Sequence, residues 1–243
     1  MSVLCRSVLE QELVEPRPPF LQELAWSASL RHGRVALRKL LRATYRSRRP
    51  VVAARYELPE LLNRRGLHGC GVEIGVKQGV FSEWFLESWS GCHLVSVDPW
   101  LEAPGHEYVD LSNVAQNEHD RFYAETQERL SRFGHRSTIW RQTGRDAAGR
   151  ILHHSLDLAY LDARHDYQSV LEDLEDWFDK VRPGGVIAGH DYVDGRFADG
   201  DFGVRSAVDE FFRARGLSVH ATFVDRPWIS WFVFLDSGQR TTV

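Results

Sequence analysis

From residue 70 onward, short apolar runs alternate with amphipathic helical segments, and this alternation most limits the fold that the chain can adopt. Strands are expected at Gly71–Ile74, His93–Val97, Thr138–Arg141, Leu156–Leu161 and Val186–Gly189. Helices are expected just after the first strand and at about 115–133, 167–181 and 204–215, with two closing strands at 218–224 and 229–235 that can pair as a hairpin. Such alternation predicts an α/β fold, a Rossmann-like, doubly wound and mostly parallel sheet with helices on both faces.

The first 50 residues have no strand signal and carry a different charge. Residues 1–50 hold 10 Lys and Arg against 4 Asp and Glu, a charge of +6, whereas residues 51–243 hold 20 against 30, a charge of −10. We therefore divide the chain into a basic helical extension, 1–50, and a main domain, 51–243. A basic amphipathic helix suits a cap on the domain or a dimer contact, and less often a membrane surface.

The bulk composition excludes several classes of protein. Three cysteines, an odd number in a chain of this length, argue against a disulfide scaffold and for a reducing compartment. No apolar run is long enough to span a bilayer, and acidic residues interrupt the N-terminus too early for a signal peptide. We expect a cytoplasmic protein. Because its main domain is acidic, we expect no nucleic acid and no membrane among its partners.

The segment after the first strand has features of a ligand site. Gly75 and Gly79 frame a tight turn into the following helix, and Glu73 stands at the end of the strand. Glycine at such a turn lets a ligand approach the backbone, and the helix N-terminus offers unpaired N–H groups. The spacing is not the dinucleotide-binding Gly-x-Gly-x-x-Gly. A carboxylate here would repel a pyrophosphate and could hold an ammonium group.

Other strand ends should add polar groups at the same edge of the sheet, where ligands of open parallel sheets bind. Asp98 ends the second strand and could accept hydrogen bonds from a ribose diol. The fourth strand leads into Asp162 and His165, and the fifth leads into His190 and Asp191. We expect these two ends to be neighbours, which would bring the four side chains together.

These motifs resemble the class I methyltransferases that use S-adenosylmethionine (SAM). The closest likeness is to a bacterial group whose fourth strand reads roughly Ile-Asp-Gly-x-His-x-Tyr and is followed by a helix and Pro-Gly-Gly. Here the segments are Leu161-Asp162-Ala163-Arg164-His165-Asp166-Tyr167 and Pro183-Gly184-Gly185, with Gly203–Phe211 also similar. The likeness covers about residues 70–235. It implies a seven-stranded sheet whose last strand is antiparallel, with SAM as cofactor.

The resemblance also implies roles for individual residues. Glu73 and Gly75 would line the methionine end of SAM, with Gly79 in the same turn, and Asp98 would bind the ribose. Gly144 and Arg145 match positions near adenine, and Asp162 borders the cofactor. A homodimer is expected by analogy with related enzymes.

The resemblance leaves the metal open. In relatives that use a divalent metal for O-methylation, Asp162 would be one ligand and the end of strand five would supply two more. Here that pair is His190-Asp191, where relatives have two oxygen ligands. Mg²⁺ prefers an all-oxygen shell, whereas a histidine with two carboxylates better suits Mn, Fe or Zn. If the enzyme uses a metal, we expect Mg or Mn, bound by Asp162, His190 and Asp191.

The sequence supports a hypothesis for the chemistry. His165 occupies the position of a basic residue in related catechol-type enzymes, and it would deprotonate a hydroxyl of a sugar or secondary-metabolite acceptor. Asp162 and Asp191 would orient that hydroxyl or His165, directly or through a metal. Segment 193–203 could be a lid, and aromatic residues could wall the acceptor pocket: Trp100, Tyr108, Tyr192, Phe197, Phe202 and Trp228.

Three alternatives remain at this point. The first is an N- or C-methyltransferase that needs no metal. The second is a SAM-binding module without catalysis, although such a module would need neither Asp162 nor His165. The third is a nicotinamide-dependent oxidoreductase, which Glu73 and the absent third glycine of the fingerprint argue against.

Overall fold

The computed structural model describes residues 52–104, 110–197, 200–225 and 228–236. The basic extension 1–50 and the aromatic Tyr108 lie outside these residues, so their predicted roles stay predictions. None of the described helices is long and apolar enough to cross a membrane.

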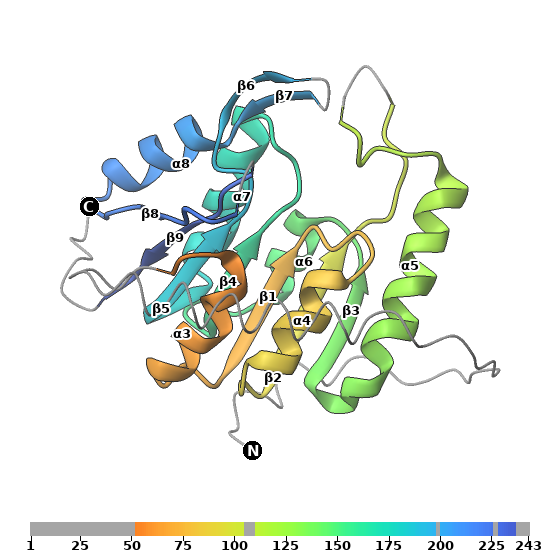
Figure 1. Cartoon of the computed structure of the whole chain (residues 1–243), viewed down its shortest axis with the longest axis horizontal. Coiled ribbons are helices and arrows are strands. Elements are labelled where there is room, and N and C mark those ends of the chain that lie inside the picture. The colour runs from red at the N-terminus through yellow and green to blue at the C-terminus, as the bar shows by residue number, and fades with distance from the viewer. Residues whose placement is uncertain (1–51, 105–109, 198–199, 226–227, 237–243) are drawn as a thin grey trace. The chain divides into compact units, whose positions relative to one another are not determined.

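One seven-stranded sheet forms the centre of the main domain (Figure 1). Its strands, in spatial order, are β3 (Ser137–Arg141), β2 (His93–Asp98), β1 (Cys70–Ile74), β4 (Leu156–Leu161), β5 (Val181–Gly189), β9 (Trp231–Phe234) and β8 (His220–Ala221). The first five are parallel to one another, and β9 pairs antiparallel with both β5 and β8. The predicted sheet, its antiparallel last strand and the closing hairpin are all confirmed.

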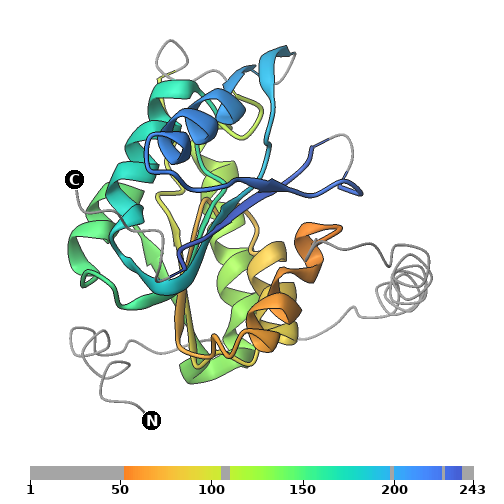
Figure 2. The ribbon, with the colours of Figure 1, turned by 90° about the vertical axis from the view of Figure 1, so that its left-hand side faces the viewer.

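Helices cover both faces of this sheet, as the edge-on view shows (Figure 2). One face carries α3 (Leu58–Arg64), α4 (Val80–Ser88) and α5 (Gln116–Leu130), and the other carries α6 (Gly144–Arg150), α7 (Tyr167–Phe178) and α8 (Val204–Arg213). Short 3-10 turns lie at Arg55–Glu57 and Ser131–Arg136. Because both faces are covered, the central strands are buried along nearly their whole length, which explains their continuous apolar runs.

Two segments differ from the expectation. The helix predicted to reach residue 181 ends at Phe178, and Pro183-Gly184-Gly185 lies inside β5 instead of before it. Gly184 has a φ of +84°, and the pairing of β4 with β5 shifts register there. The irregularity is therefore a bulge inside the strand, which glycine permits.

The segment predicted as a loop or lid at 193–203 forms a small hairpin instead. Strands β6 (Asp194–Phe197) and β7 (Gly200–Gly203) pair antiparallel and make a separate two-stranded sheet. In Figure 1 the hairpin stands above the carboxyl ends of the parallel strands, beside the loop that precedes α5. An isolated bridge between Asp110 and Gly200 joins that loop to the hairpin.

The turn after β1 is packed directly against the chain that leaves β4. Gly75 has a φ of +85°, and a Cβ added there would lie 2.0 Å from the carbonyl oxygen of Asp162. The Asp162 N–H donates to the carbonyl of Ile74 at 2.7 Å. Gly75 is therefore required by its own backbone and by Asp162, whereas the sequence suggested that a ligand required it.

Replacing Gly75 with Ala should destabilise the domain by about 2–4 kcal/mol, because the new Cβ adds left-handed strain to a backbone clash. Gly149→Ala is the matched control, since Gly149 is exposed on α6 and has no atom within 4 Å of an added Cβ. That control should be neutral or slightly stabilising. Urea denaturation midpoints compare the two, and equal stabilities would refute the proposed constraint.

Candidate active site

A cavity of about 600 Å³ opens at the carboxyl ends of the parallel strands, where the topology predicts a ligand site. Its lining includes nearly all of the residues singled out from the sequence: Glu73, Gly75, Asp98, Gly144, Arg145, Asp162, His165, His190 and Asp191. Gly79 lies between two lining residues and has a structural role, because its left-handed backbone begins α4. Its predicted part in cofactor binding stays a prediction.

Glu73 is a fully buried carboxylate beside the cavity. It accepts a hydrogen bond from the hydroxyl of Ser82 on α4, and that hydroxyl also contacts Ser96 Oγ at 3.0 Å. Burial raises the pKa of Glu73 to about 8, although the Ser82 hydrogen bond opposes the shift. A cation placed next to Glu73 would therefore stabilise its charged form.

Asp98 holds the turn after β1 in shape. Its Oδ2 accepts the backbone N–H groups of Val76 and Lys77, both at 2.9 Å, and its Oδ1 accepts that of Trp100 at 2.8 Å. A carboxylate offers about four acceptor positions, so capacity remains for a ligand hydroxyl. The cavity lining is consistent with the ribose role predicted for Asp98, which stays a prediction.

The start of α6 forms another part of the cavity wall. Gly144 packs closely, since an added Cβ would lie 3.1 Å from Ile74 Cγ2. Arg145 is largely exposed and reaches across to α7, where it pairs with Asp176 at 3.1 Å and Glu172 at 3.4 Å. These two ion pairs link Arg145 to α7. Its predicted place near adenine stays a prediction.

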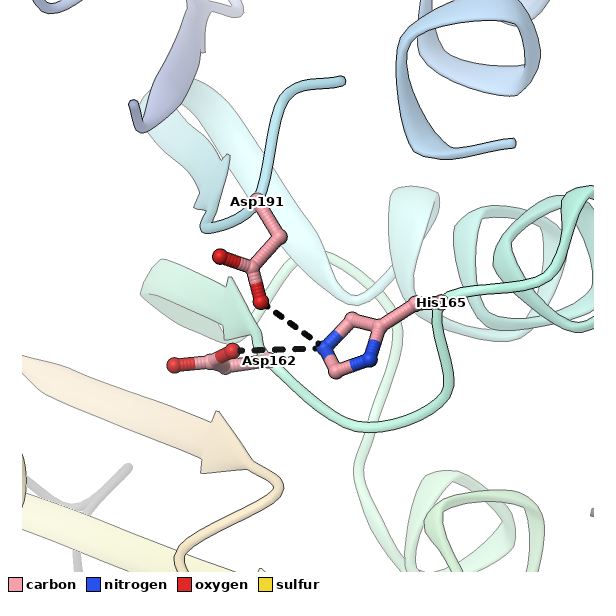
Figure 3. Close-up of side chains that lie close together, drawn as sticks. All are labelled: Asp162, His165 and Asp191. Carbon is pink, nitrogen blue, oxygen red and sulfur yellow. Dashed lines mark ion pairs between the residues drawn. The ribbon is translucent and has the colours of Figure 1, made fainter. Parts of the chain in front are cut away.

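Asp162, His165 and Asp191 converge at the centre of the site (Figure 3). His165 Nε2 lies 3.0 Å from Asp191 Oδ2 and 3.9 Å from Asp162 Oδ1, and the two carboxylates approach this nitrogen together. The atom is buried but has no well-aligned hydrogen-bond partner among the described residues. The expected meeting of the strand-four and strand-five ends is confirmed.

His190 lies next to the same cluster but is not one of its three converging residues. Its Nδ1 lies 2.7 Å from Asp191 Oδ1 and 3.9 Å from Asp162 Oδ1. The three ligand atoms that lie within 4.8 Å of one another come from Asp162, His165 and Asp191. The geometry thus favours His165 over His190 as the nitrogen donor of a metal site, and metal binding itself stays untested.

The charges around His165 control its protonation. Burial by itself lowers the pKa of this imidazole, but three surrounding carboxylates outweigh burial and raise the pKa to about 11. For Asp191, burial raises the pKa. Its contacts with His165 and His190 outweigh burial and hold that pKa well below its usual range. At neutral pH the ligand-free cluster therefore contains an imidazolium held by ionised carboxylates.

Two polar residues of the site were missed by the sequence reasoning. Asp110 accepts a hydrogen bond from His165 Nδ1 at 2.7 Å, and Arg55 lies 3.5 Å from Asp162 Oδ2. Asp110 comes from the long connection between β2 and α5, and Arg55 comes from the short turn before α3. Neither follows a strand end, so the topological argument gave no signal for them.

Comparisons with known proteins agree with this fold. Residues 72–192, about half of the chain, match the family model described as a methyltransferase domain. No curated protein sequence matches the chain.

Three solved structures illustrate the likeness in fold. An O-methyltransferase from Bacillus cereus in complex with SAH is 15% identical, with 87% of this chain and 93% of that chain covered and a TM-score of 0.52. The O-methyltransferase TomG from Streptomyces achromogenes, in complex with SAM, is 16% identical, with 87% and 91% covered and a TM-score of 0.51. A candidate rRNA methylase from Clostridium thermocellum is 14% identical, with 78% and 99% covered and a TM-score of 0.54.

At these identities the solved structures establish the fold, and the family model adds the activity. The sheet order, the cavity at the strand ends and the matched methyltransferase domain together identify the chain as a class I SAM-dependent methyltransferase.

Proposed function

We propose that this methyltransferase acts on a hydroxyl group of a small-molecule acceptor, a sugar or a secondary metabolite, with His165 as general base. The observation that carries the proposal is the position of His165 Nε2, which is buried between two carboxylates and has no well-aligned hydrogen-bond partner within the part of the chain that the structure describes. Once the ring has lost one proton, this nitrogen could accept a proton from an acceptor hydroxyl, as a general base must. A hydroxyl placed there would complete the arrangement.

The cofactor end of the site fits SAM on chemical grounds. Its methionine carries an ammonium group, and Glu73 is a buried carboxylate for which the described residues provide a hydrogen bond from Ser82 but no ion pair in direct contact. When bound, SAM supplies an electrophilic methyl group on a positively charged sulfur. The residues of the chain would bind and orient it: Glu73 at the ammonium, Asp98 at the ribose, and Gly144 and Arg145 near adenine.

His165 must lose a proton before it can accept one from a hydroxyl. Its raised pKa keeps the ring charged in the ligand-free site. A positive charge in the cavity would oppose the pull of the carboxylates and lower that pKa toward neutrality. We therefore propose that His165 becomes a competent base only when the cavity is filled. Asp162 and Asp191 then orient the hydroxyl and stabilise the imidazolium that forms.

A divalent metal would compete for the same nitrogen. Nδ1 of His165 already donates to Asp110, so Nε2 is the only nitrogen left either to bind a metal or to accept a proton. The donor set of two carboxylates and one imidazole suits Mn or Zn better than Mg. Arg55 also supplies positive charge at Asp162 from within the chain. We therefore favour a base that works without a metal.

The walls of the cavity suit a small acceptor. Trp228 lines the cavity, and its ring stacks on Phe202 at 5.4 Å. A flat aromatic surface of this kind suits a sugar or an aromatic ring. The acidic main domain disfavours an RNA acceptor.

Methylation of nitrogen or carbon stays the alternative, and a panel of acceptors with hydroxyl, amine and carbon nucleophiles separates it from O-methylation. A cytoplasmic location and a homodimer remain part of the proposal on sequence grounds.

Replacing Glu73 with Gln should weaken SAM binding at least tenfold, because the ammonium group loses its carboxylate partner. The same variant should stabilise the ligand-free protein at pH 8. The pKa of Glu73 is raised, so wild type loses stability as pH rises from about 4.5 toward 8, and Gln removes that loss. Calorimetry and thermal unfolding measure the two effects. Glu128→Gln, at an exposed position of α5, should change neither, and unchanged SAM affinity in Glu73→Gln would refute the ammonium assignment.

Replacing His165 with Gln should lower kcat by about 10²–10⁴-fold and leave the Kd for SAM within about threefold, because the proton acceptor is lost. Transfer of a tritiated methyl group to a panel of sugar and phenolic hydroxyls gives the rate. His153→Gln, at an exposed position, is the matched control. Turnover that survives in His165→Gln with intact SAM binding would rule out the base.

Chelation of metals should leave SAM binding and methyl transfer unchanged, and added Zn²⁺ or Mn²⁺ should inhibit, because the ion would occupy the nitrogen that His165 uses as a base. Steady-state rates in EDTA and after titration with each ion provide the measurement. Activation by Mg²⁺ or Mn²⁺ would contradict this expectation and would favour a metal held by Asp162, Asp191 and a neighbouring histidine.

A further inference from the structure

The ring of His165 is held by segments that lie outside its own strand end. Its Nδ1 donates to Asp110 Oδ2 at 2.7 Å, and its face stacks on the ring of Phe202 at 4.6 Å and 4° between planes. Its carbonyl accepts the Gly203 N–H at 2.9 Å. The connection before α5 and the β6–β7 hairpin therefore fix the imidazole on one edge and one face, and its Nε2 faces Asp162 and Asp191.

Asp110 is itself fixed in orientation. Its Oδ1 accepts the backbone N–H of Ser112 at 2.7 Å and also the Ser112 hydroxyl. The backbone of Asp110 bridges to Gly200 in β7, and its side chain is only 6% exposed. With one oxygen taken by Ser112, the other oxygen is directed at the imidazole.

We propose that Asp110 is a positioning residue that keeps a proton on Nδ1 of His165 and so reserves Nε2 for the reacting group. A carboxylate only accepts hydrogen bonds, so the nitrogen that faces it must carry a proton. In the ligand-free site Nε2 also faces a carboxylate, Asp191 at 3.0 Å, so the ring is an imidazolium. When the ring loses one proton, the nitrogen held by Asp110 at 2.7 Å keeps its own, and Nε2 then has the free lone pair. This assignment rests on the proposed function for its catalytic consequence, whereas the hydrogen bond that it describes is independent of it.

With Nδ1 protonated, His165 would take the acceptor proton on Nε2 during methyl transfer. The O–H bond of the acceptor breaks as its proton moves to Nε2, and the oxygen forms a bond to the methyl carbon while the carbon–sulfur bond breaks. The ring is then an imidazolium with both nitrogens protonated, and Asp110 stabilises its charge at Nδ1. If Nε2 instead held a metal, Asp110 would fix the same tautomer as the partner of a ligating histidine.

Asp110→Asn is the decisive variant, because Ser112 determines which way the new amide points. The Ser112 N–H and hydroxyl require an acceptor, so the amide oxygen takes the Oδ1 position and the NH₂ group faces Nδ1. A donor there makes Nδ1 the acceptor and moves the proton to Nε2. The substitution thus keeps the shape of the site and reverses the tautomer, whereas Asp110→Ala merely releases the ring.

The first test uses two-bond ¹H–¹⁵N spectra of the full-length, ¹⁵N-labelled protein with SAH added. Wild type and the control Asp201→Asn, which changes an exposed carboxylate on the same hairpin, should both show a protonated Nδ1 on His165. Asp110→Asn should show an unprotonated Nδ1. A protonated Nδ1 in Asp110→Asn, as in wild type, would overturn the proposal. This readout needs no turnover, so it stands even if no hydroxyl acceptor is found.

The second test compares rates with the acceptor found in the hydroxyl panel. Asp110→Asn should lower kcat at least about 100-fold, more than Asp110→Ala does, with the Kd for SAM within about threefold of wild type. A purely structural role predicts the opposite order, because Ala disturbs the packing more than the isosteric Asn. That opposite order, or a kcat for Asp110→Asn close to that of Asp201→Asn, would overturn the catalytic part of the proposal.

Discussion

The contact between the turn after β1 and the chain leaving β4 joins two parts of the site through the backbone. Gly75 and Asp162 touch through their backbones, and the Asp162 N–H is tied to Ile74. This places the strand that carries Glu73 beside the strand that leads into Asp162 and His165, and all three residues line the cavity. The separation between a cofactor end and a reacting end is therefore set by main-chain packing, which is rigid.

Charge balance governs what the reacting end can do. Three carboxylates surround His165, and within the described residues the basic side chains nearest to them are those of His165, His190 and Arg55. The site thus holds a proton tightly until another positive charge enters the cavity. Such a site suits a cationic cofactor, because under the proposed mechanism the bound cofactor would also lower the pKa of His165 and allow it to act as a base. The same charges make any metal a competitor for His165.

The sequence was sufficient for the parts that follow from periodicity and topology. The parallel strands are short apolar runs, and their carboxyl ends carry Glu73, Asp98, Asp162 and Asp191, so the sheet and most of the cavity lining were predictable. Asp110, Arg55 and the 193–203 hairpin were not. Asp110 lies in a long connection with no periodic signal, and its contact with His165 spans 55 positions of the chain. The backbone constraint on Gly75 was also not predictable, because a sequence does not show which chain segment packs against a turn; the cofactor role of Gly75 stays a prediction.

A crystal structure of the protein with SAH tests the central claim most directly, since it places the cofactor relative to the named side chains. The account predicts the amino group of SAH within hydrogen-bond distance of the Glu73 carboxylate, and its sulfur turned toward the space between Asp162 and His165 Nε2. SAH bound with its sulfur turned away from His165, or with its amino group away from Glu73, would contradict the account.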